Sequence, residues 1–185
     1  MENRPRLVLQ EIDSLSLLET ATDIQHRVFP RKGYDAYQNY KEALELVSSG
    51  RYWLLWSVEE NCFVGVSGIY LEPSDNESAW LAWFGILPEF RRRGYASEAL
   101  RLFEEAAIAR GFSYVRLYTD ADNLTARKFY EKHGYTGELY RREEDPVSFQ
   151  FDLCVYSKPF PGHPAKAWGQ RNLHLQLQFV KQAFL

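Results

Sequence analysis

The chain has 185 residues, a length that suits one domain and is enough to bury a core. Hydrophobic residues make up 45% and charged residues 25%, which is ordinary for a folded protein in water. The net charge of −3 argues against nucleic acid as a partner, because phosphate backbones attract basic surfaces. Aromatic residues reach 16%, which indicates an aromatic-lined core or pocket.

The cysteines, the histidines and the N-terminus indicate a cytoplasmic protein without a structural metal. Cys62 and Cys154 are far apart and form no CxxC pattern, so we expect two reduced, buried thiols in the cytosol. The four histidines share no metal-ligand spacing. The N-terminus is charged and has no apolar run behind it, which predicts neither a signal peptide nor a membrane span.

Helical and strand-like patterns alternate along the chain. Ser14 is a candidate N-cap for the first helix, and Gly111 suits the end of the third. In chain order we predict a strand at 7–12, helices at 14–29 and 35–47, strands at 51–57, 63–71 and 79–87, a helix at 96–110, a strand at 114–119, a helix at 125–133 and a strand at 147–156.

This order predicts an α/β (α+β) domain at 1–157, in which helices cover the faces of a sheet. Residues 158–185 are predicted to be a C-terminal extension that begins with a proline-rich connector. From Asn172 onward, Leu173, Leu177, Val180 and Phe184 recur at helical spacing, while alternation over 173–179 also suits an edge strand; we favour the helix. Its apolar residues should pack on the domain or on a partner subunit, which makes a homodimer an option.

A basic loop lies between the predicted strand at 79–87 and the helix that follows it. The N-terminus of a helix binds anions through its free N–H groups and its partial positive charge. Gly94 lets backbone approach a ligand closely, Ala96 is small, and the arginines Arg91 to Arg93 attract phosphate. The loop therefore predicts a pyrophosphate site, with an ordinary solvated basic turn as the alternative.

A second motif follows at residues 123–135, and together the two motifs resemble the GNAT superfamily of N-acetyltransferases. Arg91-x-x-Gly94-x-Ala96 is similar to the family signature Gln/Arg-x-x-Gly-x-Gly/Ala. The second is Asn123-x-x-Ala126-x-x-Phe129-Tyr130-x-x-x-Gly134-Tyr135, which matches the family pattern at nearly every position. The resemblance runs from about Tyr52 to Tyr156. It implies a mixed, mostly antiparallel central sheet flanked by helices.

The resemblance also implies an acetyl-CoA-dependent transferase that acetylates a primary amine on a small molecule or a peptide by direct attack in a ternary complex. Asn123 would hydrogen-bond the cofactor arm, and Tyr130 would sit near the sulfur as the catalytic acid. The other implied cofactor contacts are the backbone of Phe84, Gly85 and Ile86 for the pantetheine arm, and Arg91, Arg92, Arg93, Gly94, Tyr95, Ala96 and Ser97 for the pyrophosphate. No metal is implied.

Each of these roles has a structural alternative. Asn123 is also a favoured helix cap, and Tyr130 also suits a core position with a hydrogen-bonded hydroxyl. The general base is not identified: some family members carry a Glu in the strand before the loop, where this chain has Trp80. The nearby acids are Glu72, Asp75, Glu77, Asp120 and Asp122. Each would act as a base through water, or is only a solvated loop acid, which is the favoured alternative.

The acceptor pocket is expected near the first two predicted helices. Phe29, Tyr34, Tyr37 and Tyr40 would form an aromatic wall suited to a cation or a flat ring, with core packing as the alternative. Two other functions remain open, namely a CoA-binding regulatory module without transfer activity and a transferase of a longer acyl group.

Overall fold

The computed structural model describes residues 6–30, 36–72, 75–140 and 152–168. The chain divides into two compact units. Among the described residues, unit 1 holds those up to Tyr70 together with Leu81–Ala106, and unit 2 holds Leu71–Trp80 together with those from Ala107 to Trp168. Because Trp80 ends one segment and Leu81 begins another, a single strand contributes to both units.

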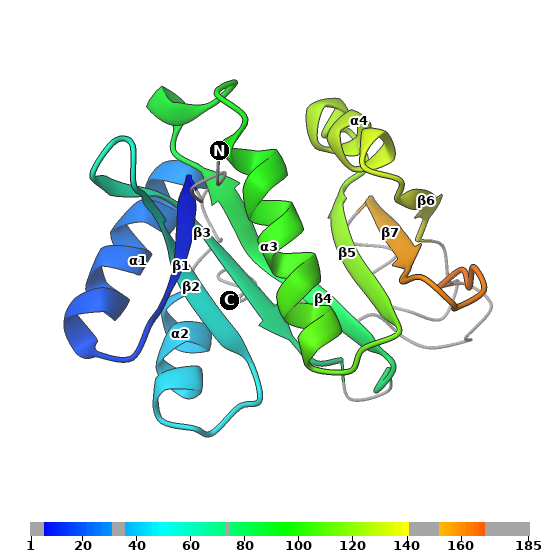
Figure 1. Ribbon diagram of the computed structural model, residues 1–185, viewed down its shortest axis with the longest axis horizontal. Coiled ribbons are helices and arrows are strands. Elements are labelled where there is room, and N and C mark those ends of the chain that lie inside the picture. The colour runs from blue at the N-terminus through cyan, green and yellow to red at the C-terminus, as the bar shows by residue number, and fades with distance from the viewer. Residues whose placement is uncertain (1–5, 31–35, 73–74, 141–151, 169–185) are drawn as a thin grey trace, which may run out of the picture. The chain divides into compact units, whose positions relative to one another are not determined.

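Seven strands and four α-helices make up the described chain, and Figure 1 labels them. The strands form one sheet in the order β1-β2-β3-β4-β5-β7-β6. The β1–β2, β2–β3, β5–β7 and β6–β7 pairs are antiparallel, whereas β4 and β5 run parallel. The mixed, mostly antiparallel sheet confirms the predicted fold class. The elements in chain order are β1 (Leu7–Glu11), α1 (Leu15–Val28), α2 (Tyr37–Leu44), β2 (Arg51–Ser57), β3 (Cys62–Tyr70), β4 (Ser78–Ile86), the 3-10 helix η1 (Pro88–Phe90), α3 (Tyr95–Ala109), β5 (Tyr114–Asp120), α4 (Leu124–Lys132), β6 (Thr136–Leu139) and β7 (Leu153–Pro159).

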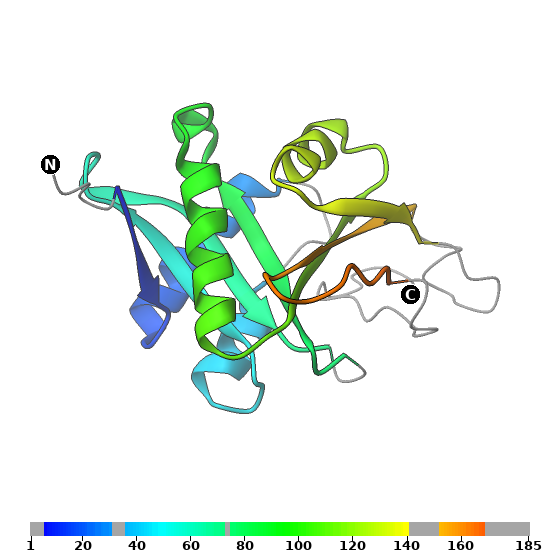
Figure 2. The ribbon, with the colours of Figure 1, turned by 45° about the vertical axis from the view of Figure 1, so that its right-hand side comes forward.

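In unit 1, helices cover both faces of the strands: α1 and α2 lie on one face and α3 on the other, as Figures 1 and 2 show. The side chain of Ser14 caps α1 by accepting a hydrogen bond from the Leu17 N–H, as predicted. The α3 face is closed by a core cluster that includes Leu7, Leu55 and Tyr95. The prediction for α2 was too long, because the helix ends at Leu44 and the chain then turns through Leu46, whose φ is +58°.

In unit 2, β7 pairs along its whole length with β5, from Tyr114↔Pro159 to Asp120↔Leu153. β7 therefore ends later than the predicted 156, whereas the predicted strand residues 147–151 lie outside the described residues. The short strand β6 pairs on the other side of β7 and was not predicted, because its sequence Thr-Gly-Glu-Leu has no run of strand-forming residues.

The chain after β7 continues to pack on unit 2. The Phe160 N–H donates to the Ser113 carbonyl, and the Trp168 ring packs edge-on against Trp80 with centroids 5.0 Å apart. Trp168 is buried. The helix predicted from Asn172 onward lies outside the described residues. No helix in the described part of the chain is both long and apolar enough to cross a membrane.

Candidate functional site

β4 is irregular at Trp83, whose φ of +47° is unusual for a bulky residue, although the strand continues to Ile86. The Trp83 indole N–H donates to the Asn39 side-chain oxygen on α2 at 2.9 Å. Its ring also meets the Phe29 ring edge-on, with centroids 5.9 Å apart. Contacts from α2 and from the end of α1 therefore hold this part of β4 in place.

Phe84, Gly85 and Ile86, the predicted backbone contacts for the pantetheine arm, follow this irregularity. The parallel ladder between β4 and β5 joins only three residue pairs, and it ends at Trp80↔Arg116. The residues from Leu81 to Ile86 thus lie beyond that ladder. Gly85 is required by packing, because a Cβ there would lie 2.2 Å from Cγ1 of Val28 on α1.

The segment 91–97, which we call the phosphate loop, carries β4 and η1 into α3. Arg92 has a φ of +61° and Gly94 a φ of +87°. Glycine adopts this left-handed conformation without strain, which explains Gly94. The Gly94 carbonyl accepts the first hydrogen bond of α3, from the Glu98 N–H at 3.2 Å. The N–H groups of Tyr95 and Ala96, in the first turn of α3, have no carbonyl partners within the helix.

The three arginines of the phosphate loop differ in what they contact. Arg91 turns back and donates to the Ile86 carbonyl at 2.9 Å. Arg93 pairs with Glu60 at 2.9 Å. Arg92 is exposed and makes no hydrogen bond or ion pair with another residue in the described part of the chain. Only Arg92 thus has a guanidinium that is not already engaged, whereas the sequence alone had assigned all three to an anion.

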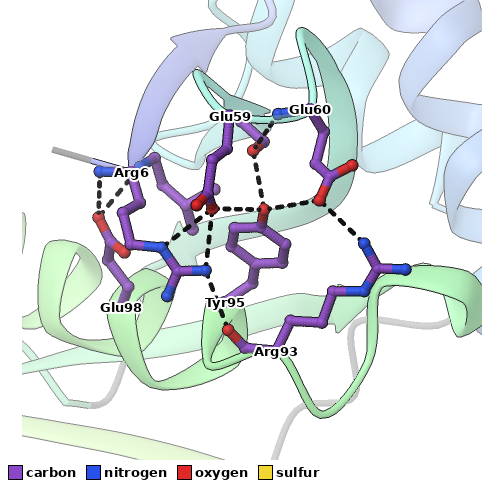
Figure 3. A network of polar contacts seen from close by, with 8 residues as sticks. Arg6, Glu59, Glu60, Arg93, Tyr95 and Glu98 are labelled. Carbon is purple, nitrogen blue, oxygen red and sulfur yellow. Dashed lines mark hydrogen bonds and ion pairs between the residues drawn. The ribbon is translucent and has the colours of Figure 1, made fainter.

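Tyr95 has a structural side chain, because its ring is buried in the core cluster of unit 1. Its hydroxyl accepts a hydrogen bond from Ser57 and lies 3.2 Å from a carboxylate oxygen of both Glu59 and Glu60 (Figure 3). Burial is the main cause that raises the pKa of this hydroxyl. A ligand can therefore contact the backbone N–H of Tyr95 but not its ring.

Asn123 is the N-cap of α4. Its side-chain oxygen accepts a hydrogen bond from the Ala126 N–H at 3.2 Å, and its amide nitrogen lies 3.5 Å from the Thr119 hydroxyl. The side chain is exposed. The Asn123 oxygen therefore caps the helix, as the structural alternative expects. The amide nitrogen has a second hydrogen, which it can donate to a ligand.

Tyr130 lies on α4 and is buried among aromatic rings, with Phe129, Tyr135 and Tyr156 at centroid distances of 5.3, 5.8 and 5.7 Å. Burial raises the pKa of its hydroxyl well above the usual range. Within the described part of the chain, this hydroxyl donates to no other residue. The group is therefore a protonated phenol at neutral pH that still has a hydrogen to donate.

Tyr156, beside Tyr130, belongs to a polar group that the sequence did not reveal. Its hydroxyl donates to Glu131 at 2.8 Å and accepts from Arg127 at 3.3 Å. Burial is the main cause that raises the pKa of Tyr156 to about 12. Arg127 and Glu131 lie four residues apart on α4, a spacing that places two side chains on one face of a helix. That spacing is the one feature of the sequence from which this polar group could have been inferred.

Two of the acids considered as bases, Asp75 and Glu77, form ion pairs. Asp75 is fully buried with Arg116, at 3.1 Å from Oδ2 to Nε, and it also accepts from the Trp80 indole at 3.3 Å. Glu77 pairs with Lys166 at 2.7 Å. Glu72 is buried, Asp120 is half-buried and Asp122 is exposed. Asp75 is therefore part of the core of unit 2 rather than a free base.

The expected aromatic wall forms only in part. Tyr40 is buried and packs edge-on against Tyr52 on β2, so for this residue the core-packing alternative is correct. Phe29 is half-buried and meets Trp83, which the sequence had not suggested. Tyr37 is exposed, and Tyr34 lies outside the described residues. Among the residues that the structure describes, no group of three or more His, Cys, Asp or Glu side chains is placed to hold a metal ion.

Comparison with known proteins gives one family. The model of the acetyltransferase (GNAT) family matches residues 15–135. An uncharacterised N-acetyltransferase, YycN of Bacillus subtilis strain 168, is 37% identical over 84 residues, which cover 44% of this chain and 54% of that protein. The match thus spans about half the length of this curated relative.

Solved structures share the fold. A putative GNAT acetyltransferase from Desulfovibrio desulfuricans superposes with a TM-score of 0.65 at 12% identity, over 83% of this chain and 98% of its own. A GNAT acetyltransferase from Elizabethkingia anophelis, solved with acetyl-CoA bound, gives a TM-score of 0.63 at 13% identity, over 85% of this chain and 100% of its own.

Proposed function

Because the chain belongs to the acetyltransferase (GNAT) family, we propose that it transfers an acetyl group from acetyl-CoA to a primary amine. The observation that carries the proposal is the phosphate loop, in which a left-handed Gly94 leads directly into the first turn of α3. Free N–H groups at a helix N-terminus bind anions, and the unengaged, exposed Arg92 adds positive charge beside them. A structural relative from Elizabethkingia anophelis was solved with acetyl-CoA bound, which supports the same substrate here.

The remaining predicted contacts are proposed as a set. The backbone of Phe84, Gly85 and Ile86 would bind the pantetheine arm, since these residues lie beyond the β4–β5 ladder. The second amide hydrogen of Asn123 would bond the same arm while its oxygen caps α4. The pyrophosphate would be bound by the loop N–H groups and Arg92, with Arg91 and Arg93 supporting the loop through their contacts to Ile86 and Glu60.

The proposed reaction is a direct transfer in a ternary complex. A lysine-like amine has a pKa of about 10, so it must first lose a proton to water or to a base. The neutral nitrogen then attacks the thioester carbonyl, and a backbone N–H at the end of β4, near Ile86, would stabilise the oxyanion. This attack forms the C–N bond, and the nitrogen then loses its second proton to water. Collapse of the tetrahedral intermediate breaks the C–S bond. Tyr130 donates its proton to the departing thiolate and is then reprotonated from solvent.

Neither cysteine is needed in this reaction. Cys154 is buried, and burial is the main cause that raises the pKa of its thiol, which lowers the fraction of reactive thiolate. Cys62 is half-buried and lies at the start of β3. Both are free thiols in the structure.

Binding and turnover test the proposal separately. Acetyl-CoA should raise the melting temperature of the protein, and Gly94→Glu should abolish that rise by adding bulk and negative charge at the loop. Release of free CoA thiol should then depend on an added amine, for which the panel is a peptide with a free N-terminus, an N-blocked peptide with one lysine, and a polyamine. Gly111→Glu is the matched control, because Gly111 also has a positive φ of +83° but lies outside the proposed site. Normal acetyl-CoA binding by Gly94→Glu would show that the phosphate loop is not the pyrophosphate site.

A second candidate is a CoA-binding module without transfer activity. Two observations on the described residues favour it: Trp80 stands where some family members carry a Glu, and Asp75 is fully buried in its pair with Arg116. This candidate predicts the rise in melting temperature without amine-dependent thiol release. Release of thiol with any amine in the panel would exclude it.

A further inference from the structure

We propose that Arg6 is a positioning residue for the phosphate loop, and that it orients the Arg93–Gly94 peptide for binding the pyrophosphate; this inference rests on the proposed function. Arg6 immediately precedes β1 and lies far from the loop in sequence. Its guanidinium donates to the Arg93 carbonyl at 3.1 Å (Figure 3). In a trans peptide the N–H points opposite to the C=O. Turning the Arg93 carbonyl toward Arg6 therefore turns the Gly94 N–H away from Arg6, where it can meet an anion.

Arg6 is itself held by three residues, one in the turn between β2 and β3 and two on α3. Glu59, in the turn between β2 and β3, accepts from its Nε at 3.2 Å and from its Nη2 at 3.1 Å. The guanidinium lies over the Tyr95 ring, 4.8 Å from its centroid. Glu98 on α3 accepts the backbone N–H groups of both Arg6 and Leu7, at 2.9 and 3.0 Å. The start of β1 is thus joined to the loop by a side chain and to the first turn of α3 by its backbone.

The guanidinium also fills the space beside Gly94. A Cβ on Gly94 would lie 3.2 Å from Nη1 of Arg6. The three nitrogens of Arg6 therefore have separate roles: Nε binds Glu59, Nη2 bridges Glu59 and the Arg93 carbonyl, and Nη1 lies against Gly94. Lysine has one charged nitrogen and no planar fork, so it cannot make this set of contacts. The hydrogen bond from Arg6 lowers the pKa of the Glu59 carboxyl.

The contribution of Arg6 to folding should be small, because the side chains of Arg6 and Glu59 are 43% and 61% exposed and exposed ion pairs add little to stability. Loss of Arg6 should thus affect binding of pyrophosphate more than folding. The pair Arg101–Glu105 on α3 is a matched control, since its side chains are 53% and 56% exposed and it does not contact the loop.

The experiment compares wild type, Arg6→Gln, Arg6→Lys and Arg101→Gln with two acetyl donors, acetyl-CoA and S-acetylpantetheine, which lacks the pyrophosphate. Both Arg6 variants should keep a melting temperature close to wild type. They should raise the Kd of CoA and the KM for acetyl-CoA about tenfold, the change expected when one hydrogen bond to a charged group is weakened, with little change in kcat. With S-acetylpantetheine, kcat/KM should match wild type. Arg101→Gln should behave as wild type with both donors.

Three results would overturn the inference. One is wild-type affinity for CoA in both Arg6 variants, and another is an equal loss of affinity in Arg101→Gln. The third is an equal loss of kcat/KM with both donors, which would indicate a general structural role. Failure of the wild-type protein to bind acetyl-CoA would instead refute the proposed function and this inference with it. Glu59→Gln, which removes the partner that aligns Arg6, should give a smaller loss in the same direction.

Discussion

Replacing Gly85 by alanine should force β4 and α1 apart, although Gly85 has an ordinary φ and no turn to make. The added Cβ would lie 2.2 Å from Cγ1 of Val28 and 3.4 Å from the Phe29 ring. Carbon atoms in van der Waals contact lie about 3.5–4.0 Å apart, so the Val28 contact is more than 1 Å too short. Val28 is buried on α1 and cannot simply turn into solvent. We expect the free energy of unfolding to fall by about 1–3 kcal/mol, the usual cost of overpacking.

A double-mutant cycle tests this explanation. Its second change is Val28→Ala, which removes the clashing methyl group. Alone it should cost about 2 kcal/mol through lost burial and a small cavity. In the double variant the methyl group added at position 85 occupies part of that space, so the total loss should be well below the sum of the two single losses. Urea denaturation of the four proteins gives the coupling energy, which should be at least about 1 kcal/mol.

Substitutions at two other glycines distinguish this clash between side chains from a clash with backbone and from conformational strain. At Gly65 an added Cβ would lie 2.2 Å from the carbonyl oxygen of Gly85, which is backbone, so Val28→Ala should not rescue Gly65→Ala. Gly111 has a φ of +83° and nothing within 4 Å of an added Cβ, so Gly111→Ala should cost about 1 kcal/mol from conformation alone. The reasoning fails if Gly85→Ala is neutral, or if its loss simply adds to that of Val28→Ala.

Three further changes test the proposed chemistry and the end of the described chain. Tyr130→Phe should lower the single-turnover rate on the order of 10²-fold while CoA binding stays intact, and an unchanged rate would remove Tyr130 from the mechanism. Burial raises the pKa of Tyr130 above its usual 10.0, so this acid stays protonated through neutral pH. The contribution of Tyr130 to kcat should therefore be lost only above about pH 10. A fall in kcat below that pH that disappears in Tyr130→Phe would contradict the assignment. Deleting residues 162–185 should lower the free energy of unfolding by about 3–5 kcal/mol, mainly because the buried Trp168 ring no longer packs against Trp80. In a thermal or urea melt, Trp168→Ala alone should reproduce most of this loss.

Local chemistry determined much of this protein from the sequence. Ser14 and Asn123 are helix caps because a short polar side chain just before an apolar helical pattern bonds the free N–H groups of the first turn. The predicted helices and strands lie within a few residues of the observed ones, with two exceptions. The last strand ends later than predicted, and β6 is too short to show a pattern. The two motifs also indicated the family, since both depend on residue types at close spacing.

Only the tertiary structure decided which partner each polar or aromatic side chain has. The sequence presents Arg91, Arg92 and Arg93 as equivalent charges, yet one bonds the Ile86 carbonyl, one pairs with Glu60 and one is exposed and unengaged among the described residues. Asp75 is read as a loop acid until Arg116 is found beside it, 41 positions away in the chain. Periodicity and composition report the neighbours of a residue along the chain, whereas a hydrogen bond or an ion pair depends on neighbours in space that the packing of distant strands and helices brings together.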